Sequence, residues 1–312
     1  MSMGNQRRPQ AVMLSKRANV FYLEHVRVLQ KDDRVVYMTQ SSNPVEQIVN
    51  IPDKNTAFIL LGKGSSITDA AVRMLAESNV IIGFTGSGGS PMHGIVDPVF
   101  ITPQDEYRPT EYMQNWVRFW LDEDARLSAA KDFLRYRIEL SQAFYPKISE
   151  FELPGALTDD FSFAIDKCAN VTELLTAEAR YAKQLYALHA NASAIKFSRT
   201  PGEVSGDEKN RRANSFLDHG NYIAYGYAAA ALHVLGINYA FPVLHGKTRR
   251  GALVFDVADL VKDWLIMPAA FDAARRKVKD QAFRATVIER AIQYEVLDIL
   301  IPFLKSVSSK YI

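Results

Sequence analysis

Residues 20–37 read VFYLEHVRVLQKDDRVVY, and this stretch decides how the first part of the chain folds. Its β-branched and aromatic residues fall into three short runs, at 20–23, 26–29 and 34–37, and the polar KDD at 31–33 separates the last two. Apolar runs bounded by turn-forming residues are typical of β-strands. The chain is therefore expected to begin with a sheet.

The same pattern continues to about residue 84. Further strands are expected at 57–61 and 80–84, where the residues are almost all apolar. Between them, the spacing of apolar side chains predicts a helix from about residue 67 to 77, with Ser66 as its cap. The first part of the chain is thus predicted to be β-rich.

Beyond residue 110 the hydrophobic pattern takes the period of α-helices, and Leu153-Pro154-Gly155 interrupts it. Helices are expected at 112–145, 160–189, 208–234, 253–265, 268–282 and 283–305. Strands followed by helices indicate an α+β fold with two segregated domains. We place an N-terminal β-rich domain at 1–104 and a larger all-helical domain at 105–312.

Composition narrows the class of protein. The 312 residues include 37 Lys and Arg against 35 Asp and Glu, and 48% of them are hydrophobic, as in an ordinary globular chain. The single cysteine, Cys168, excludes an internal disulfide and a cysteine-type zinc site. No apolar run reaches the roughly 18 residues that cross a bilayer, and the N-terminus is polar. We expect a cytoplasmic protein with no membrane partner.

Three common catalytic motifs do not match. The GKGSS at 62–66 lacks the spacing of a phosphate-binding loop, because Gly64 follows Lys63 and residue 58 is phenylalanine. The glycines at 83–89 lack the last glycine of a dinucleotide turn, and no Gly-x-Ser-x-Gly nucleophile elbow occurs. Catalysis by a serine or cysteine nucleophile is therefore not supported.

One group of residues has the chemistry of a metal site. His245 lies in a predicted turn, and Asp256 and Asp259 follow on a helix, where a spacing of three places their carboxylates on one face. Glu178 lies in a mostly apolar helical stretch. One imidazole with several carboxylates suits Mg²⁺ or Mn²⁺ better than zinc. The same residues also allow a structural interpretation, in which the histidine belongs to a turn and the acids interact with a helix dipole.

Basic residues cluster in the last part of the chain, at Arg211-Arg212, at Lys247 with Arg249 and Arg250, and at Arg275, Arg276 and Lys277 with Lys279. Such clusters can bind a phosphate backbone, although each taken alone also fits a solvated helix face.

An ordered series of short segments carries a family resemblance. Along the chain these are Ala177-Glu178-Ala179, Tyr186, Asn210 with Asn214, YIAYGY at 222–227, Leu244-His245-Gly246 and ALVFDVAD at 252–259. The series resembles the CRISPR-associated integrase, a metal-dependent nuclease that inserts new spacers. The length and the GKTRR loop at 246–250 are most similar to the version in subtype I-F systems.

The resemblance implies a β-rich N-terminal domain and a helical catalytic domain. It also implies Glu178, His245 and Asp259 as catalytic residues and ligands of Mg²⁺ or Mn²⁺, with Asp256 as a neighbouring acid. The family often has a glutamate at the position of Asp259. Lys262-Asp263-Trp264 stands where the family commonly has an aromatic-basic pair.

The resemblance therefore implies a DNA endonuclease and integrase, in which a DNA 3′-hydroxyl attacks a phosphodiester. We expect Lys247, Arg249, Arg250, Arg275 and Arg276 to contact the phosphates of double-stranded DNA, both the incoming fragment and the CRISPR repeat. The resemblance also implies a small adaptation partner fused to a helicase-nuclease. It further implies a homodimer, for which we expect the β-rich domain at 1–104 to be the dimerisation module. The alternative is a non-catalytic helical protein that binds nucleic acid or acts as a scaffold.

Overall fold

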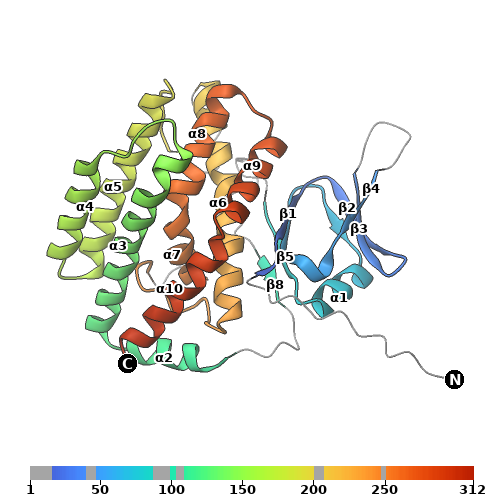
Figure 1. Cartoon of the computed structure of the whole chain (residues 1–312), viewed down its shortest axis with the longest axis horizontal. Coiled ribbons are helices and arrows are strands. Elements are labelled where there is room, and N and C mark those ends of the chain that lie inside the picture. The colour runs from blue at the N-terminus through green and yellow to red at the C-terminus, as the bar shows by residue number, and fades with distance from the viewer. Residues whose placement is uncertain (1–15, 40–46, 87–98, 103–108, 200–206, 247–250) are drawn as a thin grey trace.

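The computed structural model describes residues 16–39, 47–86, 99–102, 109–199, 207–246 and 251–312. Strands and one helix lie at the N-terminal side of the molecule, and the remaining helices form a bundle beside them (Figure 1). The predicted α+β fold is confirmed. The change from strands to helices lies between Ile101 and Glu111, and the domain boundary at 104/105 stays a prediction.

The described strands form two sheets. The first has the order β1 (Asn19–Leu23), β5 (Thr56–Leu61), β7 (Ile81–Phe84) and β8 (Val99–Ile101), with β1, β5 and β7 parallel and β8 antiparallel. The second has the order β4 (Ile48–Ile51), β3 (Arg34–Thr39), β2 (Val26–Lys31) and β6 (Ser66–Ile67). A 3₁₀ turn, Asp53–Asn55, leads into β5. The strands expected at 20–37, 57–61 and 80–84 are confirmed.

Strand β5 is buried along its whole length, because the first sheet is covered on both faces. Phe58 and Leu60 point into the core shared with the helices, whereas Ile59 and Leu61 belong to a smaller core with the second sheet and helix α1 (Asp69–Glu77). A Cβ atom at Gly226 of the bundle would lie 2.3 Å from the Phe58 ring. Only a glycine therefore lets the helix approach the sheet this closely.

The helical half is divided more finely than the sequence predicted. Its helices are α2 (Glu111–Trp120), α3 (Glu123–Ile148), α4 (Gly155–Lys167), α5 (Val171–Ala192), α6 (Glu208–Val234), α7 (Ala252–Val261), a π-helix (Lys262–Ile266), α8 (Met267–Arg276), α9 (Asp280–Gln293) and α10 (Val296–Lys310). The helix expected at 112–145 is interrupted, because the side chain of Asp122 caps α3. The break expected near Pro154 is confirmed.

Four other expected boundaries were wrong. The helix expected at 160–189 breaks at Cys168, which is buried at the end of α4, and restarts where Asn170 caps α5. The helix at 268–282 ends at Arg276, and that at 283–305 is broken where Glu295 adopts a positive φ of 49°. Helix α1 is capped by Thr68 rather than Ser66.

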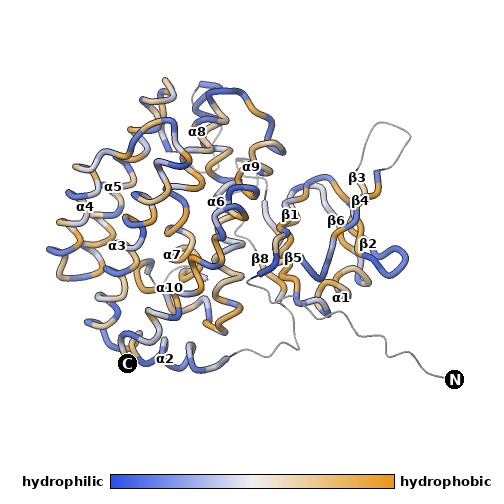
Figure 2. Tube along the Cα trace, viewed as in Figure 1, coloured by the Kyte–Doolittle hydropathy of each residue, from blue (hydrophilic) through white to orange (hydrophobic). Residues whose placement is uncertain are grey.

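The bundle packs around α6, which contacts α7, α8, α9 and α10. Hydrophobic and hydrophilic residues alternate along the helices, as expected for helices with one buried face (Figure 2). In the part of the chain that the structure describes, no helix is both long and apolar enough to cross a bilayer.

Candidate active site

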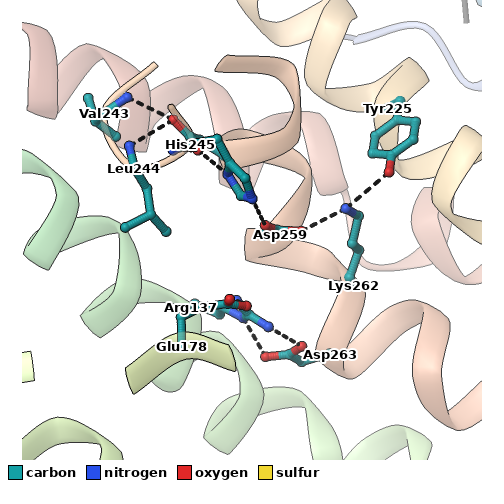
Figure 3. A network of polar contacts seen from close by, with 10 residues as sticks. Arg137, Glu178, Tyr225, Val243, Leu244, His245, Asp259, Lys262 and Asp263 are labelled. Carbon is teal, nitrogen blue, oxygen red and sulfur yellow. Dashed lines mark hydrogen bonds and ion pairs between the residues drawn. The ribbon is translucent and has the colours of Figure 1, made fainter. Parts of the chain in front are cut away.

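The first side of the candidate site is the loop before α7, which carries His245. The carboxylate of Asp256 in α7 accepts hydrogen bonds from three backbone N–H groups of this loop, those of Val243 (2.7 Å), Leu244 (3.1 Å) and His245 (3.0 Å). The Asp256 side chain is fully buried, and its Oδ1 also lies 2.6 Å from Nδ1 of the His245 ring. One carboxylate therefore fixes both the loop and the imidazole (Figure 3).

Two tryptophans of α2 hold the start of the same loop. The indole nitrogen of Trp116 donates to the carbonyl oxygen of Phe241 at 3.0 Å, and that of Trp120 donates to Pro242 at 2.6 Å. The loop is thus tied to α2 on one side and to α7 on the other, so the imidazole has a defined position.

The second ring nitrogen of His245 is directed toward Asp259. Because Nδ1 faces a carboxylate, it carries a proton, and in the neutral ring Nε2 presents its lone pair. Nε2 lies 3.9 Å from Oδ2 of Asp259, which is beyond hydrogen-bond range. Burial lowers the pKa of His245, but the hydrogen bond to Asp256 and the charge of Asp259 outweigh it and raise the pKa above its usual value.

Asp259 itself is paired with Lys262. The ammonium group lies 2.7 Å from Oδ1 of Asp259 and 3.4 Å from the hydroxyl of Tyr225, and it sits 4.5 Å from the centre of that ring. Burial opposes ionisation of Asp259, yet the charges of Lys262, Arg137 and His245 together hold its pKa below the usual range. Asp259 is therefore an ionised acid in a partly closed site.

Glu178 lies on the other side of the site, in α5. Its Oε1 accepts a hydrogen bond from Nη1 of Arg137 at 2.8 Å. The same guanidinium makes a two-pronged pair with Asp263 of the π-helix, at 2.6 and 2.8 Å. The Asp263 side chain is completely buried, and the Arg137 side chain is 4% exposed.

Side chains from both sides of the site line one small cavity of about 100 Å³. They include Glu178, Arg137, Asp259, Lys262 and Asp263. The structure thus brings Asp256 and Asp259 together with His245, and it places Glu178 on a wall shared with Asp259. The sequence spacing alone did not show which acid faces which.

The donor set fits a hard divalent cation. An imidazole nitrogen with a free lone pair and two carboxylates, those of Asp259 and Glu178, are ligands that Mg²⁺ and Mn²⁺ accept. The hydrogen bond from His245 to Asp256 is the usual support for a metal-binding histidine. Within the described ranges no three such side chains already converge on one point. Without a cation, Asp259 pairs with Lys262 and Glu178 pairs with Arg137.

The predicted DNA-binding residues fall into two groups. Lys247, Arg249 and Arg250 lie outside the described residues. Arg275 and Arg276, at the end of α8, are 40% and 55% exposed and both pair with Glu150 and Asp272. They are solvent-accessible cations, and their role in DNA binding stays a prediction.

Sequence reasoning missed Arg137. The signal was present in α3, where Arg137 falls among the buried Phe133, Leu134, Ile138 and Ser141 at helical spacing. An arginine on an apolar helix face needs an acidic partner inside the protein. Its partners, however, come from two distant segments of the chain.

Comparison with known proteins gives a consistent family match. The family model described as CRISPR associated protein Cas1 matches residues 20–297. The chain is 44% identical to the CRISPR-associated endonuclease Cas1 of Pseudomonas aeruginosa (strain UCBPP-PA14), over 96% of this chain and 95% of that one. It is 43% identical to the protein of the same name from Pectobacterium atrosepticum, over 96% and 94% of the two chains.

Solved structures share the fold. A CAS1 protein from Thermotoga maritima superposes with a TM-score of 0.75 at 14% identity, over 94% of this chain and 97% of that one. A casposase bound to its integration product superposes with a TM-score of 0.72 at 14% identity, over 93% and 91% of the two chains. At these identities the likeness concerns the fold alone.

Proposed function

The chain belongs to the Cas1 family of CRISPR-associated proteins, and on this premise we propose that it is the DNA endonuclease and integrase that inserts spacers into a CRISPR array. Its curated relatives carry the name CRISPR-associated endonuclease, and their similarity extends over nearly the whole chain. The observation that carries the proposal is the pairing of His245 with Asp256, which leaves Nε2 facing Asp259, an acid that lines the same cavity as Glu178.

We assign the chemistry to these side chains as follows. Glu178, His245 and Asp259 would hold a Mg²⁺ or Mn²⁺ ion, which when bound stabilises negative charge on the attacked phosphate. Asp256 keeps the proton on Nδ1 of His245 and fixes the loop, so we assign it to positioning rather than to direct coordination. The attacking group is a 3′-hydroxyl of DNA, so no protein nucleophile is needed.

The test is a strand-transfer assay with a labelled DNA fragment and a supercoiled target, run with Mg²⁺ or with EDTA. We expect joined product only with Mg²⁺. Glu139→Ala, an exposed acid on α3, is the matched control for changes of the site acids. DNA binding without joined product under any divalent cation would favour the alternative of a non-catalytic scaffold.

DNA contact and assembly belong to the same proposal. We assign Lys247, Arg249, Arg250, Arg275 and Arg276 to the phosphates of double-stranded DNA, which predicts weaker binding as salt increases. The relatives from Pseudomonas and Pectobacterium support a subtype I-F setting, in which the small adaptation partner is fused to a helicase-nuclease.

A homodimer through the β-rich part is the remaining element of the proposal. Strand β4 is at the edge of its sheet and exposes Ile48, and such an edge can pair with a second copy. Light scattering should give twice the 35.1 kDa mass of one chain. Ile48→Lys should shift the protein toward monomer, whereas Phe163→Lys, at an exposed position on α4, should not. A monomeric wild-type protein would contradict the proposed homodimer.

A further inference from the structure

The buried guanidinium of Arg137 contacts two acids of different kinds. Arg137 donates from Nε and Nη2 to the two carboxylate oxygens of Asp263, which is fully buried. It donates from Nη1 to one oxygen of Glu178, Oε1, and Glu178 lines the small cavity. Asp263 therefore has the geometry of an anchor, whereas Glu178 keeps a carboxylate oxygen that Arg137 does not engage.

Neighbouring contacts lock this arrangement in place. Phe144 of α3 stacks on Trp264 of the π-helix, with ring centres 4.2 Å apart. The Trp264 indole donates to the carbonyl oxygen of Leu260 at 3.0 Å. The stack thus packs helix α3 against the π-helix near the Arg137–Asp263 pair, and the indole bond fixes the orientation of Trp264. The guanidinium cannot move without disturbing a packed interior.

The charges show what the third contact does. The side chains around the cavity include three carboxylates, of Glu178, Asp259 and Asp263, and two cations, Arg137 and Lys262. Taken together, these five groups carry a formal charge of minus one, which favours a cation. The contact from Arg137 therefore orients the Glu178 carboxylate, while the set as a whole keeps the charge that would attract a cation.

We propose that Arg137, anchored by Asp263, is the positioning residue that holds Glu178 ready for a divalent cation. The inference rests on the proposed function, because it assigns a task to Glu178 in the same site. It goes further in naming a buried ion pair, remote in sequence, on which cation affinity depends. Loss of a side chain that supports a metal ligand typically weakens metal binding roughly 10- to 100-fold.

The experiment measures binding of Mn²⁺ alone to the full-length protein, by the electron paramagnetic resonance signal of the free ion. The main variant is Arg137→Met with Asp263→Leu, which removes both buried charges of this pair together, so that neither is left buried without the other. The matched control is Arg135→Met with Asp166→Leu, an exposed arginine–aspartate pair that starts from the same helix. We expect a roughly 10- to 100-fold rise in Kd for the first and no change for the second.

A purely structural role would not act through Glu178, so the same change is also made in a Glu178→Ala background. In that background the double change should cause no further rise in the Kd of Mn²⁺, because the Glu178 carboxylate that Arg137 orients is already absent. An unchanged Kd in the first variant, or a second full loss in the Glu178→Ala background, would overturn the inference. Circular dichroism and thermal denaturation establish that the variants are folded.

If the double variant does not fold, Arg137→Lys replaces it. Lysine keeps the charge but cannot reproduce the three-pronged contact, so Mn²⁺ binding should still weaken. Wild-type affinity in a folded Arg137→Lys protein would also overturn the inference. Failure of the proposed function gives a different result, since Glu178→Ala itself would then bind Mn²⁺ as tightly as the wild type.

Discussion

The two sides of the candidate site hold their side chains by different means. On the side of α7, the carboxylate of Asp256 gathers backbone N–H groups and the ring of His245, all within a short stretch of chain. On the side of α5, a buried guanidinium from α3 holds Glu178 and is itself held by Asp263. Contacts within a short stretch of chain thus position the His245 imidazole, whereas contacts between distant segments position Glu178.

The largest effect should come from removing any one of the three proposed ligands, because in the proposed site both sides act on the same ion. Glu178→Ala, His245→Ala and Asp259→Ala should each lower strand transfer on the order of 100-fold or more, with the fold retained. The assay is joined product against a supercoiled target with Mg²⁺. Normal activity in two of the three variants would show that the two sides do not form one site.

The next effect is a loss of folding stability that should differ between the two sides of the site. Asp256→Ala leaves three loop N–H groups without their acceptor and should lower the free energy of unfolding by about 3 kcal/mol or more, at about 1–3 kcal/mol for each buried unpaired group. Glu178→Ala removes one charge-assisted hydrogen bond, from Arg137, at a partly open site and should cost less, about 1.5–3 kcal/mol. Urea denaturation measures both. Equal losses would contradict a structural role specific to Asp256.

Asp256→Ala should also weaken cation binding less than Asp259→Ala does. Its oxygens are already used by the loop and by His245, so it acts on the ion only through the imidazole. Calorimetric titration with Mn²⁺ decides the order. A greater loss for Asp256→Ala would make it a direct ligand.

A smaller effect concerns pH. The pKa of His245 is raised in the folded protein, so its protonated form stabilises the fold. Without metal, this stabilisation is complete below the unfolded pKa of about 6.5 and is lost as pH rises through the folded pKa.

Urea denaturation in EDTA across this pH window tests the effect, with His245→Gln as the comparison. The difference in stability between wild type and variant should shrink as pH increases, and Mn²⁺ affinity should rise in the same window because Nε2 must be neutral to bind. A difference that stays constant with pH would contradict the raised pKa. Arg137 on the opposite side stays charged throughout, because its acidic partners outweigh burial and raise its pKa.

The smallest effect is expected at Tyr225. Its hydroxyl lies 3.4 Å from the Lys262 ammonium, a long contact, and the ring face remains in Tyr225→Phe. The variant should lose about 0.5 kcal/mol or less. A loss above about 2 kcal/mol, measured by thermal denaturation, would mean that Asp259 depends on the hydroxyl for its position.

Much of the fold could be predicted from the sequence, because local patterns carry it. The runs at 20–37 and 57–61 show the β-branched and aromatic composition of strands, and their neighbours are turn formers. Helix breaks were harder, although one had a signal. The Asn170 side chain accepts a hydrogen bond from the backbone N–H of Glu173, and the Glu173 carboxylate accepts from the Asn170 side chain and from the backbone N–H of Ala169. The spacing of three between Asn170 and Glu173 is typical of a helix cap and is visible in the sequence.

Spacing along the chain indicated only the local part of the site, and Glu178 was assigned to it by the family resemblance. The His245–Asp256 pairing joins residues 11 apart in sequence, and the loop connecting them is short. The Arg137 contacts join residues 41 and 126 apart, and neither separation corresponds to a helical or strand repeat. The π-helix at Lys262–Ile266 was likewise not predicted, because its wider turn leaves no mark in a hydrophobic pattern of period 3.6.

The complete burial of β5 has a consequence for how the protein unfolds. One face of the strand, with Phe58 and Leu60, belongs to the core shared with the helices, and the other face, with Ile59 and Leu61, belongs to the smaller core. The stability of the two cores is therefore coupled through β5. Melting either core would leave one face of β5 bare to water, at a cost of about 1.5–3 kcal/mol for each large apolar side chain. Heating should therefore produce a single cooperative heat-absorption peak, with the sheets and the bundle unfolding together rather than in succession.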